Sequence, residues 1–489
     1  MNSKKEQGLL ENPVLNQHAK EVLDSDRCMV PPSPELRVKI KDELEQLRNA
    51  SGGLMQTMLR AKPRTPVGMN DGLIYPGSNF PVGTPVFTIQ RAAADRAPLR
   101  GTIRVIVVLV EFSDKAFDQT IQHYEDLFFS VGVLSNGSVR EYFDEVSNGL
   151  VNIVGQVVGP YTLPKKLVEY ANGASGTGLL PPNARTMARD AAEAANPDVD
   201  FTLYDNNNDN YVDAFVVLHA GAGAESTGNV NDIWSHKWVL PGGDYDADGV
   251  KIYAYLTVPE EAKVGVCCHE LGHLLFGFPD LYDTDYSSEG VGNWCLMSGG
   301  SWLGGGEIPA HLSAWCKVQQ GWVTVEEPAD SVGLGINDVK TGHTVYRLWK
   351  NGAPGKEYFL IENRQKTLYD RELPGEGLLI WHIDDTIPTN SNEIHPKVAL
   401  VQSDGNKDLE YGNNRGDAGD PFPGSTNNTR FDSASTPNSH SYSGLDTCVR
   451  VRNIGAPGPV MTADIETMCK VDGLSWLQKL LRWLFSILR

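Results

Sequence analysis

The five consecutive residues His269-Glu270-Leu271-Gly272-His273 constrain this chain more than any other feature of its sequence. Side chains at positions i and i+4 of a helix share one face, so a helix here aims both imidazoles at one point. Zinc requires that arrangement of its first two nitrogen ligands. Glu270 follows the first histidine and is placed to act as general base toward a metal-bound water. The motif therefore predicts a helix that carries a zinc-dependent hydrolytic site.

A chance pair of histidines on a surface helix is the alternative interpretation of so short a motif. The flanking residues argue against it, because most are apolar and predict a buried helix. They are Val264, Val266, Leu271, Leu274, Leu275 and Phe276. Histidines that face inward from a buried helix need polar partners, which favours a metal site.

A catalytic zinc takes a third protein ligand, and the residues after the helix offer one. Gly277 allows a left-handed turn and Pro279 prevents the helix from resuming, so the chain folds back. Asp280 then becomes the candidate third ligand, and Asp283 is the second choice. The alternative is that Asp280 only caps a turn.

The same region resembles the immune inhibitor A family of metalloproteases, which are metzincin-like zinc enzymes. The resemblance rests on the His-Glu motif, on Gly277–Asp283 and on Trp294–Trp302, and it extends over most of residues 100–465. It implies a zinc peptidase domain with His269, His273 and Asp280 as metal ligands, Glu270 as general base and Met297 in a Met-turn beneath the metal.

The resemblance also implies an edge strand that binds the substrate as an added β-strand. The candidate for this strand is the stretch Tyr211–Gly223. His219 and His236 are candidates for roles around the metal site or at an oxyanion, and the alternative is that each is a structural histidine with satisfied hydrogen bonds.

The order of patterns along the chain predicts an α+β (α/β-like) metzincin-type catalytic domain followed by an all-β, sandwich-like domain. Strands are expected at 103–110, 151–158 and 211–219, and helices at 138–146 and 183–195. Further strands are expected at 358–362, 377–383, 398–401 and 449–451. The expected divisions are 1–96, a propeptide-like or bracing segment; 97–324, catalytic; 325–468, β-rich; and 469–489, a basic amphipathic helix.

The N-terminal segment contains one predicted helix. Ser33 is its cap and Pro34 lies in its first turn; the apolar stripe that follows consists of Leu36, Ile40, Leu44 and Leu47. A propeptide and a solvated tail with one docked helix are the two interpretations. Cys28 adds the hypothesis that a thiolate of this segment occupies the open zinc position and keeps the enzyme latent.

A loop rich in oxygen side chains predicts a calcium site. Asp205, Asn207, Asp209 and Asp213 follow the spacing of the first part of a calcium-binding loop, with the backbone carbonyl of Tyr211 at the seventh position. The bidentate glutamate at the twelfth position is absent, so an acidic loop without an ion is the alternative. A shorter cluster of the same kind lies at 244–249.

Charge and cysteine content narrow the possible partners and location. The chain has 489 residues, with 42 Lys and Arg against 62 Asp and Glu, and a net charge of −20. This excess of acidic residues argues against nucleic acid as a partner. With seven cysteines, at least one is free or pairs with another chain, and Cys448 and Cys469 are close enough in sequence to form a disulfide. The family resemblance implies an extracellular enzyme, although the N-terminus has no recognisable signal peptide.

The last residues, 473–489, form a basic amphipathic pattern that suits a membrane surface or a groove on a partner; a helix docked on its own protein is the alternative. Taken together, the sequence predicts a monomeric zinc metalloendopeptidase that acts on proteins or peptides. The rival hypothesis is a non-enzymatic surface-binding protein whose metal site is structural or inactive.

Overall fold

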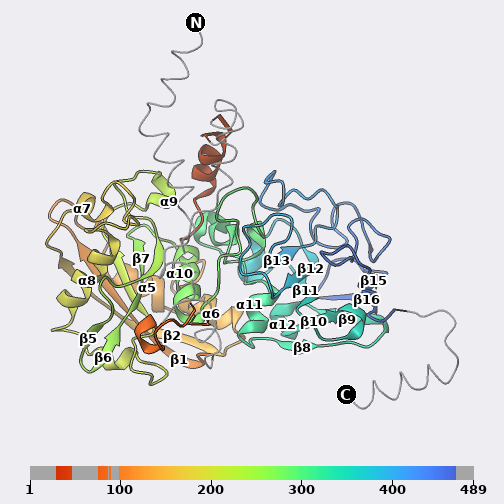
Figure 1. Ribbon diagram of the computed structural model, residues 1–489, viewed down its shortest axis with the longest axis horizontal. Helices are drawn as coiled ribbons and strands as arrows, with labels where there is room; N and C mark the ends of the chain where they lie inside the picture. Colours follow the sequence, from red (N-terminus) through yellow and green to blue (C-terminus); the bar gives the residue numbers. More distant parts are fainter. Residues whose placement is uncertain (1–28, 44, 47–74, 86–87, 90–97, 470–489) are drawn as a thin grey trace, which may run out of the picture.

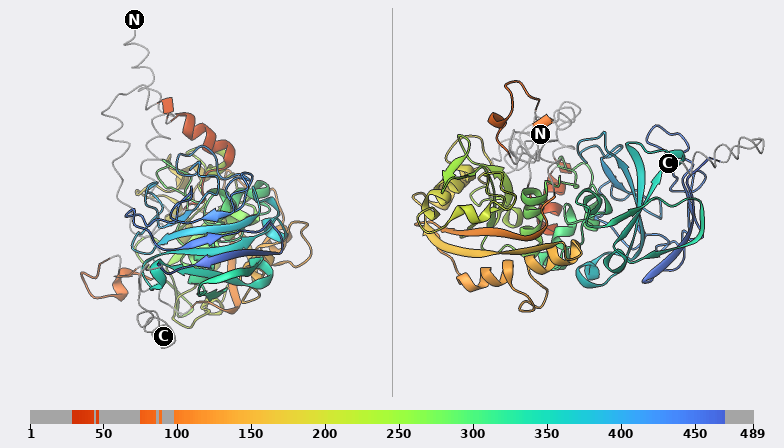
Figure 2. Two further views of the ribbon diagram at one scale, coloured as in Figure 1. Left: turned by 90° about the vertical axis from the view of Figure 1, so that its right-hand side faces the viewer. Right: turned by 90° about the horizontal axis from the view of Figure 1, so that it is seen from below.

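The computed structural model describes residues 29–43, 45–46, 75–85, 88–89 and 98–469. Figure 1 shows two parts side by side, a mixed α/β part from the first half of the chain and a β-rich part from the second. Helix α10 (Val264–Phe276), which carries the His-Glu motif, lies near the middle of the molecule. A helix over residues 34–43, dark red in Figure 1, lies above the region where the two parts meet, and the view from below in Figure 2 also shows it between them.

The α/β part is built on a five-stranded sheet with strand order β2-β1-β3-β7-β4. Its strands are β1 (Gly101–Glu111), β2 (Val151–Thr162), β3 (Phe215–His219), β4 (His236–Val239) and β7 (Ala254–Pro259). Every neighbouring pair is parallel except β4 and β7, which run antiparallel. The central strands are buried on both faces, which explains why they are near-continuous apolar runs. β4 is an edge strand of this sheet.

Helices pack on this sheet through faces that their sequences define. α5 (Ile121–Phe129) and α6 (Val139–Val146) pack on β2, α8 (Ala184–Ala195) packs on β1, β2 and β7, and α10 packs on β7 and β4. α6 begins with a capping box between Ser138 and Glu141, and α8 begins at the Asn183 cap. Shorter elements are α7 (Leu167–Ala171), η2 (Phe201–Tyr204), α9 (Ala224–Thr227), β5 (Tyr245–Ala247) and β6 (Val250–Ile252).

The β-rich part contains two sheets that share one hydrophobic cluster. The first has the order β13-β12-β11-β10-β8 and the second β14-β15-β16-β9. Phe359 and Ile380 of the first sheet meet Phe431 and Met461 of the second in this cluster. The strands are β8 (Thr324–Glu326), β9 (Ser331–Asn337), β10 (Thr344–Trp349), β11 (Glu357–Arg364), β12 (Gly377–Asp384), β13 (Val398–Leu400), β14 (Arg430–Phe431), β15 (Arg450–Arg452) and β16 (Val460–Glu466). All pairs are antiparallel except β8 and β10.

Buried charges join the two parts. Asp370 accepts hydrogen bonds from the Arg364 guanidinium and, through Oδ1, from the backbone N–H of His311 at 3.0 Å. Lys317 of α11 (Ala314–Gln319) forms an ion pair of 3.1 Å with Glu362 of β11. Because these groups are fully buried, they hold the β-rich part in a defined position against the α/β part.

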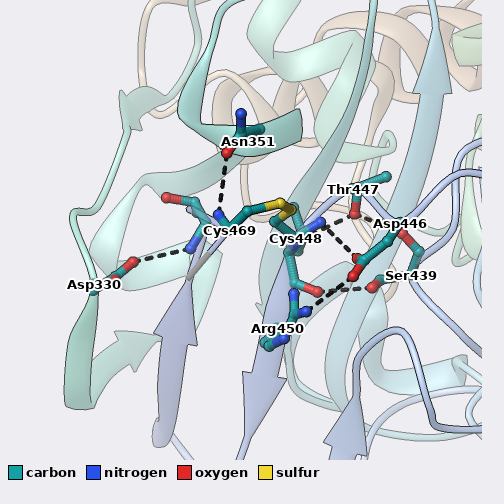
Figure 3. Close-up of a disulfide and its surroundings, with 10 residues drawn as sticks. Asp330, Asn351, Ser439, Asp446, Thr447, Cys448, Arg450 and Cys469 are labelled. Carbon is teal, nitrogen blue, oxygen red and sulfur yellow. Dashed lines mark hydrogen bonds and ion pairs between the residues drawn. A yellow bond between two sulfur atoms is a disulfide. The ribbon is translucent and has the colours of Figure 1, made fainter. Parts of the chain in front are cut away.

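A disulfide joins Cys448 to Cys469, as the sequence spacing allowed. Figure 3 shows that the end of the described chain is also held by Asn351, whose side-chain oxygen accepts from the Cys469 N–H at 3.1 Å. The other cysteines in the described ranges, Cys267, Cys268, Cys295 and Cys316, are buried and free. Cys28 lies outside the described residues.

The strands and helices expected from sequence are confirmed, with different ends. The strand expected at 211–219 begins only at Phe215, and β2 extends to Thr162. The sequence patterns did not reveal β4 or β7, the strands next to α10. The Ser33 hydroxyl accepts from the Leu36 N–H at 3.2 Å, which confirms the predicted cap. Leu44, Leu47 and residues 473–489 lie outside the described side chains. Among the described residues, no helix is both long and apolar enough to cross a membrane.

Candidate active site

Helix α10 brings the His-Glu motif into the interior. All its residues are buried, which agrees with the apolar flanks. The helix ends at Gly277, whose φ of 65° is left-handed and whose N–H bonds back to the carbonyl of His273. The chain then reverses, as the sequence predicted, and returns Asp280 toward the helix.

Three side chains converge at the centre of the site. The Nε2 atoms of His269 and His273 lie 3.1 Å apart, and each lies 3.1 Å from Oδ1 of Asp280. All three residues are buried. They form one of two groups of three or more potential ligands within the described ranges. The structure therefore brings together the three residues that the sequence singled out as zinc ligands.

The hydrogen bonds behind the histidines determine what this site binds. Nδ1 of His269 lies 2.9 Å from the carbonyl of Leu296, and Nδ1 of His273 lies 2.6 Å from the carbonyl of Phe278. A carbonyl only accepts, so each Nδ1 carries the proton and each Nε2 presents a lone pair. Two lone pairs and a carboxylate oxygen then meet at 3.1 Å. Such a set of acceptors is stabilised by a cation, and the donor types fit zinc.

Glu270 lies beside this group with no hydrogen-bond partner, among the described residues, for either of its buried carboxylate oxygens. Burial raises the pKa of Glu270 well above its usual range, and the charges of Asp280 and Glu225 add to the shift. The backbone N–H of Val30 faces the carboxylate and acts in the opposite direction. A buried acid without a partner is costly to fold, which points to a role in chemistry. Burial also lowers the pKa of His273.

Met297 lies directly beneath the helix. A β carbon at Gly272 would lie 2.8 Å from its sulfur, so the glycine permits this approach. The carbonyl of Met297 accepts from the N–H of Leu281, the residue after Asp280. Met297 thus supports both the helix and the loop that carries the third candidate ligand.

Asp283, the second choice for the third ligand, is used elsewhere. Its Oδ2 accepts from the Ser288 N–H at 2.9 Å and from the Ser287 hydroxyl at 2.9 Å, and its Oδ1 accepts from the Asp285 N–H at 3.1 Å. It is not a member of the three-ligand group. Its carboxylate therefore stabilises the loop after Asp280.

The expected position of the substrate-binding edge strand is wrong. Within 211–223, β3 is an inner strand that pairs with β1 on one side and β7 on the other, so its backbone groups are already bonded. The edge strands are β2 and β4, and β4 is the one that packs against α10. The error has a physical cause, because β4 is only four residues long and is buried throughout, so it shows no alternating pattern.

His219 and His236 are not members of the three-ligand group. Nδ1 of His219 lies 3.0 Å from the Ala220 carbonyl. His236 is more fully bonded, with Nδ1 2.6 Å from the Trp234 carbonyl and Nε2 3.0 Å from the Tyr255 hydroxyl. These contacts favour the structural interpretation of His236.

Residues 29–33 lie along the free edge of β4, which the sequence did not reveal. Met29 forms an antiparallel bridge with His236, and the N–H of Val30 donates to the Ser235 carbonyl at 3.3 Å. Met29 and Val30 are buried, and Val30 belongs to the large hydrophobic cluster that includes the core of the α/β part. The chain's own N-terminal segment therefore covers the candidate site.

Two side chains not foreseen from sequence hold this edge. The carboxylate of Glu225 accepts from the hydroxyl of Ser235 at 2.6 Å and from its N–H at 3.0 Å. Burial raises the pKa of Glu225 to about 7. The carbonyl of Glu225 also accepts from the Ser33 N–H. No sequence pattern indicated Glu225, since a single acidic residue in a short helix carries no local signal.

The predicted calcium loop is ordered by its own hydrogen bonds. Asp205 accepts from the N–H groups of Asp209 and Asn210, and Asp213 accepts from the Asn206 N–H at 2.6 Å. Asn207 Oδ1 also accepts from the Asp209 N–H. The loop carboxylates do not form a three-ligand group, whereas the partly buried Asp404, Asp408 and Asp417 do. Calcium at 205–213, with the Tyr211 carbonyl as a ligand, stays a prediction, as does the shorter cluster, where Asp244 pairs with Lys251 at 2.8 Å.

A mixed α/β sheet beside a helix with two histidines and a glutamate, completed by a returning aspartate, is the arrangement expected of a metallopeptidase active site. Comparison with known proteins agrees. Residues 98–323 match the family described as immune inhibitor A peptidase M6, catalytic domain. This match agrees with the resemblance seen in the sequence and places the similarity to that catalytic domain in residues 98–323.

Curated relatives support this assignment over about half of the chain. The pre-pro-metalloprotease PrtV of Vibrio cholerae serotype O1 is 30% identical over 309 residues, which is 51% of this chain and 33% of PrtV. Immune inhibitor A of Bacillus thuringiensis subsp. alesti is 30% identical over 281 residues, 46% of this chain and 41% of that protein. The aligned part thus spans well under half the length of each relative.

Proposed function

We propose that the protein is a zinc-dependent metalloendopeptidase that hydrolyses peptide bonds in proteins. In this proposal His269, His273 and Asp280 hold the metal. The observation that carries the proposal is the convergence of three acceptor atoms at 3.1 Å, beside the carboxylate of Glu270, for which the described residues provide no hydrogen-bond partner. Zinc bound there would supply a positive charge that polarises the substrate carbonyl and acidifies water.

Glu270 is the proposed general base. Its buried carboxylate removes a proton from the attacking water and transfers it to the nitrogen of the leaving amine. Met297 supports the helix from below as the Met-turn residue. The rival hypothesis, a non-enzymatic surface-binding protein with an inactive metal site, has no use for an unpaired acid at this position.

We also propose a metzincin-type catalytic domain over 97–324 and a β-sandwich domain over 325–468. The antiparallel edge strand β4 beside α10 supports the first assignment, and the hydrophobic cluster shared by the two C-terminal sheets supports the second. Residues 1–96 are the proposed propeptide, since 29–33 cover the site. The proposal further includes an extracellular location and a monomeric state. It also includes a calcium ion at 205–213 and contact with a membrane through residues 473–489.

A proteolysis assay with removal and return of zinc tests the function. The full chain is treated briefly with trypsin to detach the N-terminal segment, then offered casein in the presence of a chelator and after zinc is added back. We expect hydrolysis only with zinc. Absence of hydrolysis in a zinc-loaded, folded sample from which the segment has been removed would favour the rival hypothesis.

A further inference from the structure

The peptide bond between Met29 and Val30 is held through both its carbonyl and its N–H group. On one side, the hydroxyl of Tyr282 donates to the carbonyl of Met29 at 2.8 Å. On the other side, the N–H of Val30 donates to the Ser235 carbonyl and faces the carboxylate of Glu270. The carbonyl and the N–H of the Met29–Val30 bond therefore each have a partner of the kind that peptide hydrolysis requires.

The residues after Val30 are fixed by side-chain donors. The indole of Trp234 donates to the Val30 carbonyl at 2.9 Å, that of Trp302 donates to the Pro31 carbonyl at 2.6 Å, and Arg415 donates to the Pro32 carbonyl at 3.3 Å. Prolines have no N–H to pair with a strand, so these donors replace a regular ladder. Pro31 also biases Val30 toward an extended backbone. The segment is thus held in an extended form along β4.

The geometry points to a self-processing site. We propose that the Met29–Val30 bond is positioned for hydrolysis and that the zinc-loaded enzyme cuts its own chain there. In this proposal the Tyr282 hydroxyl is a catalytic donor to the carbonyl under attack. This inference rests on the proposed peptidase function and adds to it a cleavage site and a second catalytic side chain.

The step balances with one water molecule. The water oxygen bonds to the carbonyl carbon of Met29 while the carbonyl oxygen gains negative charge, which the Tyr282 hydroxyl stabilises. The bond to the Val30 nitrogen then breaks, and Glu270 transfers the proton that it took from the water to that nitrogen. The products are a fragment that ends at Met29 and a chain that begins at Val30.

The position of Tyr282 agrees with this role. It is buried and lies two residues after Asp280, so the loop that provides the third candidate ligand also positions the hydroxyl. The ring of Tyr286 stacks beside it, with centroids 6.3 Å apart. Tyr286 contacts the guanidinium of Arg37 through its ring face. Tyr286→Phe therefore removes a hydroxyl next to the site and serves as a matched control for Tyr282→Phe.

The experiment follows the mass of the chain itself. Full-length protein is purified in chelator, given zinc, and sampled over time by intact mass spectrometry and N-terminal sequencing. We expect a new N-terminus at Val30, with a first-order rate that does not depend on protein concentration, and no cleavage in Glu270→Ala. Tyr282→Phe should slow this cleavage by about 100-fold or more, whereas Tyr286→Phe should leave it unchanged.

A measurement without turnover separates a catalytic hydroxyl from one that only holds the segment. In metal-free Glu270→Ala protein, hydrogen exchange of the Val30 amide should be protected. Protection should persist when Tyr282→Phe is added, because the other donors remain. If the added change abolishes protection, Tyr282 is only an anchor and its catalytic role is refuted.

Failure of the self-processing site and failure of the peptidase function give different results. If the zinc-loaded chain hydrolyses casein after trypsin treatment but leaves its own Met29–Val30 bond intact, or cuts elsewhere, the self-processing site is wrong and the peptidase function stands. If neither casein nor the chain is cut, the peptidase function itself fails.

Discussion

Oδ1 of Asp280, on the loop after helix α10, lies 3.1 Å from Nε2 of His269. Two acceptors are stable at this distance, in a buried site, when a cation lies between them. Asp280→Ala should therefore lower zinc affinity by at least about 100-fold, measured by metal analysis after dialysis against a competing chelator.

Asp283→Ala is the matched control, because Asp283 follows on the same loop but bonds to Ser287 and Ser288. We expect it to keep stoichiometric zinc and to lose only stability. Equal zinc loss in the two variants would reassign the third ligand.

The N-terminal segment should depend on Arg37. This side chain is buried, forms an ion pair of 2.9 Å with Glu289, and donates to the carbonyl of Tyr286 at 3.3 Å. Arg37→Ala should weaken docking of the segment by about 2 kcal/mol, since hydrogen bonds to charged groups contribute about that much. Faster hydrogen exchange over residues 29–43 is the readout. Lys39→Ala, an exposed change on the same helix, should leave exchange unaltered; equal effects would show that helix charge alone governs docking.

Stability should fall with rising pH because of Glu225. Burial raises its pKa from 4.5 to about 7, so the folded state favours the protonated carboxyl. The stabilisation that Glu225 contributes to the folded state is fully present below about pH 4.5 and is lost as the pH rises through about 7. Between these limits, the difference in unfolding free energy between wild type and Glu225→Gln should change by roughly 3 kcal/mol. Denaturant titrations of both proteins at a series of pH values measure it, and a constant difference would contradict the assignment.

The contact between the two parts should depend on Asp370. Burial alone would raise its pKa, but the charges of Arg364, His311 and Lys340 outweigh burial and hold the pKa well below the usual range. Asp370→Asn leaves the buried Arg364 without a full partner, so we expect a loss of about 3–5 kcal/mol in denaturant unfolding. Glu193→Gln, which breaks an exposed pair with Arg189, should cost at most about 0.5 kcal/mol. Similar losses would mean that the buried network contributes little.

The features that could be predicted from the sequence are those that depend on residues close together along the chain. His269, Glu270 and His273 fall on one helix, Gly277 ends it, and Asp280 follows within a few residues, so periodicity and turn chemistry were sufficient. The cap at Ser33 was local in the same way.

What sequence reasoning missed depends on contacts between distant segments. Whether β3 or β4 forms the sheet edge is decided by strand order, which no single strand encodes. The pairing of Met29 with His236 and the hydrogen bond from Tyr282 to Met29 join residues more than 200 positions apart. The supporting role of Glu225 depends on its hydrogen bond with Ser235, which no local sequence pattern predicts.

The most direct test of zinc-dependent hydrolysis measures zinc content and peptide hydrolysis on the same samples of wild type and Glu270→Ala, both treated briefly with trypsin. We predict one zinc per chain in both proteins, and a rate of casein hydrolysis at least about 100-fold lower in the variant. A variant that hydrolyses casein at the wild-type rate, or a folded wild type that binds no zinc, would contradict this prediction.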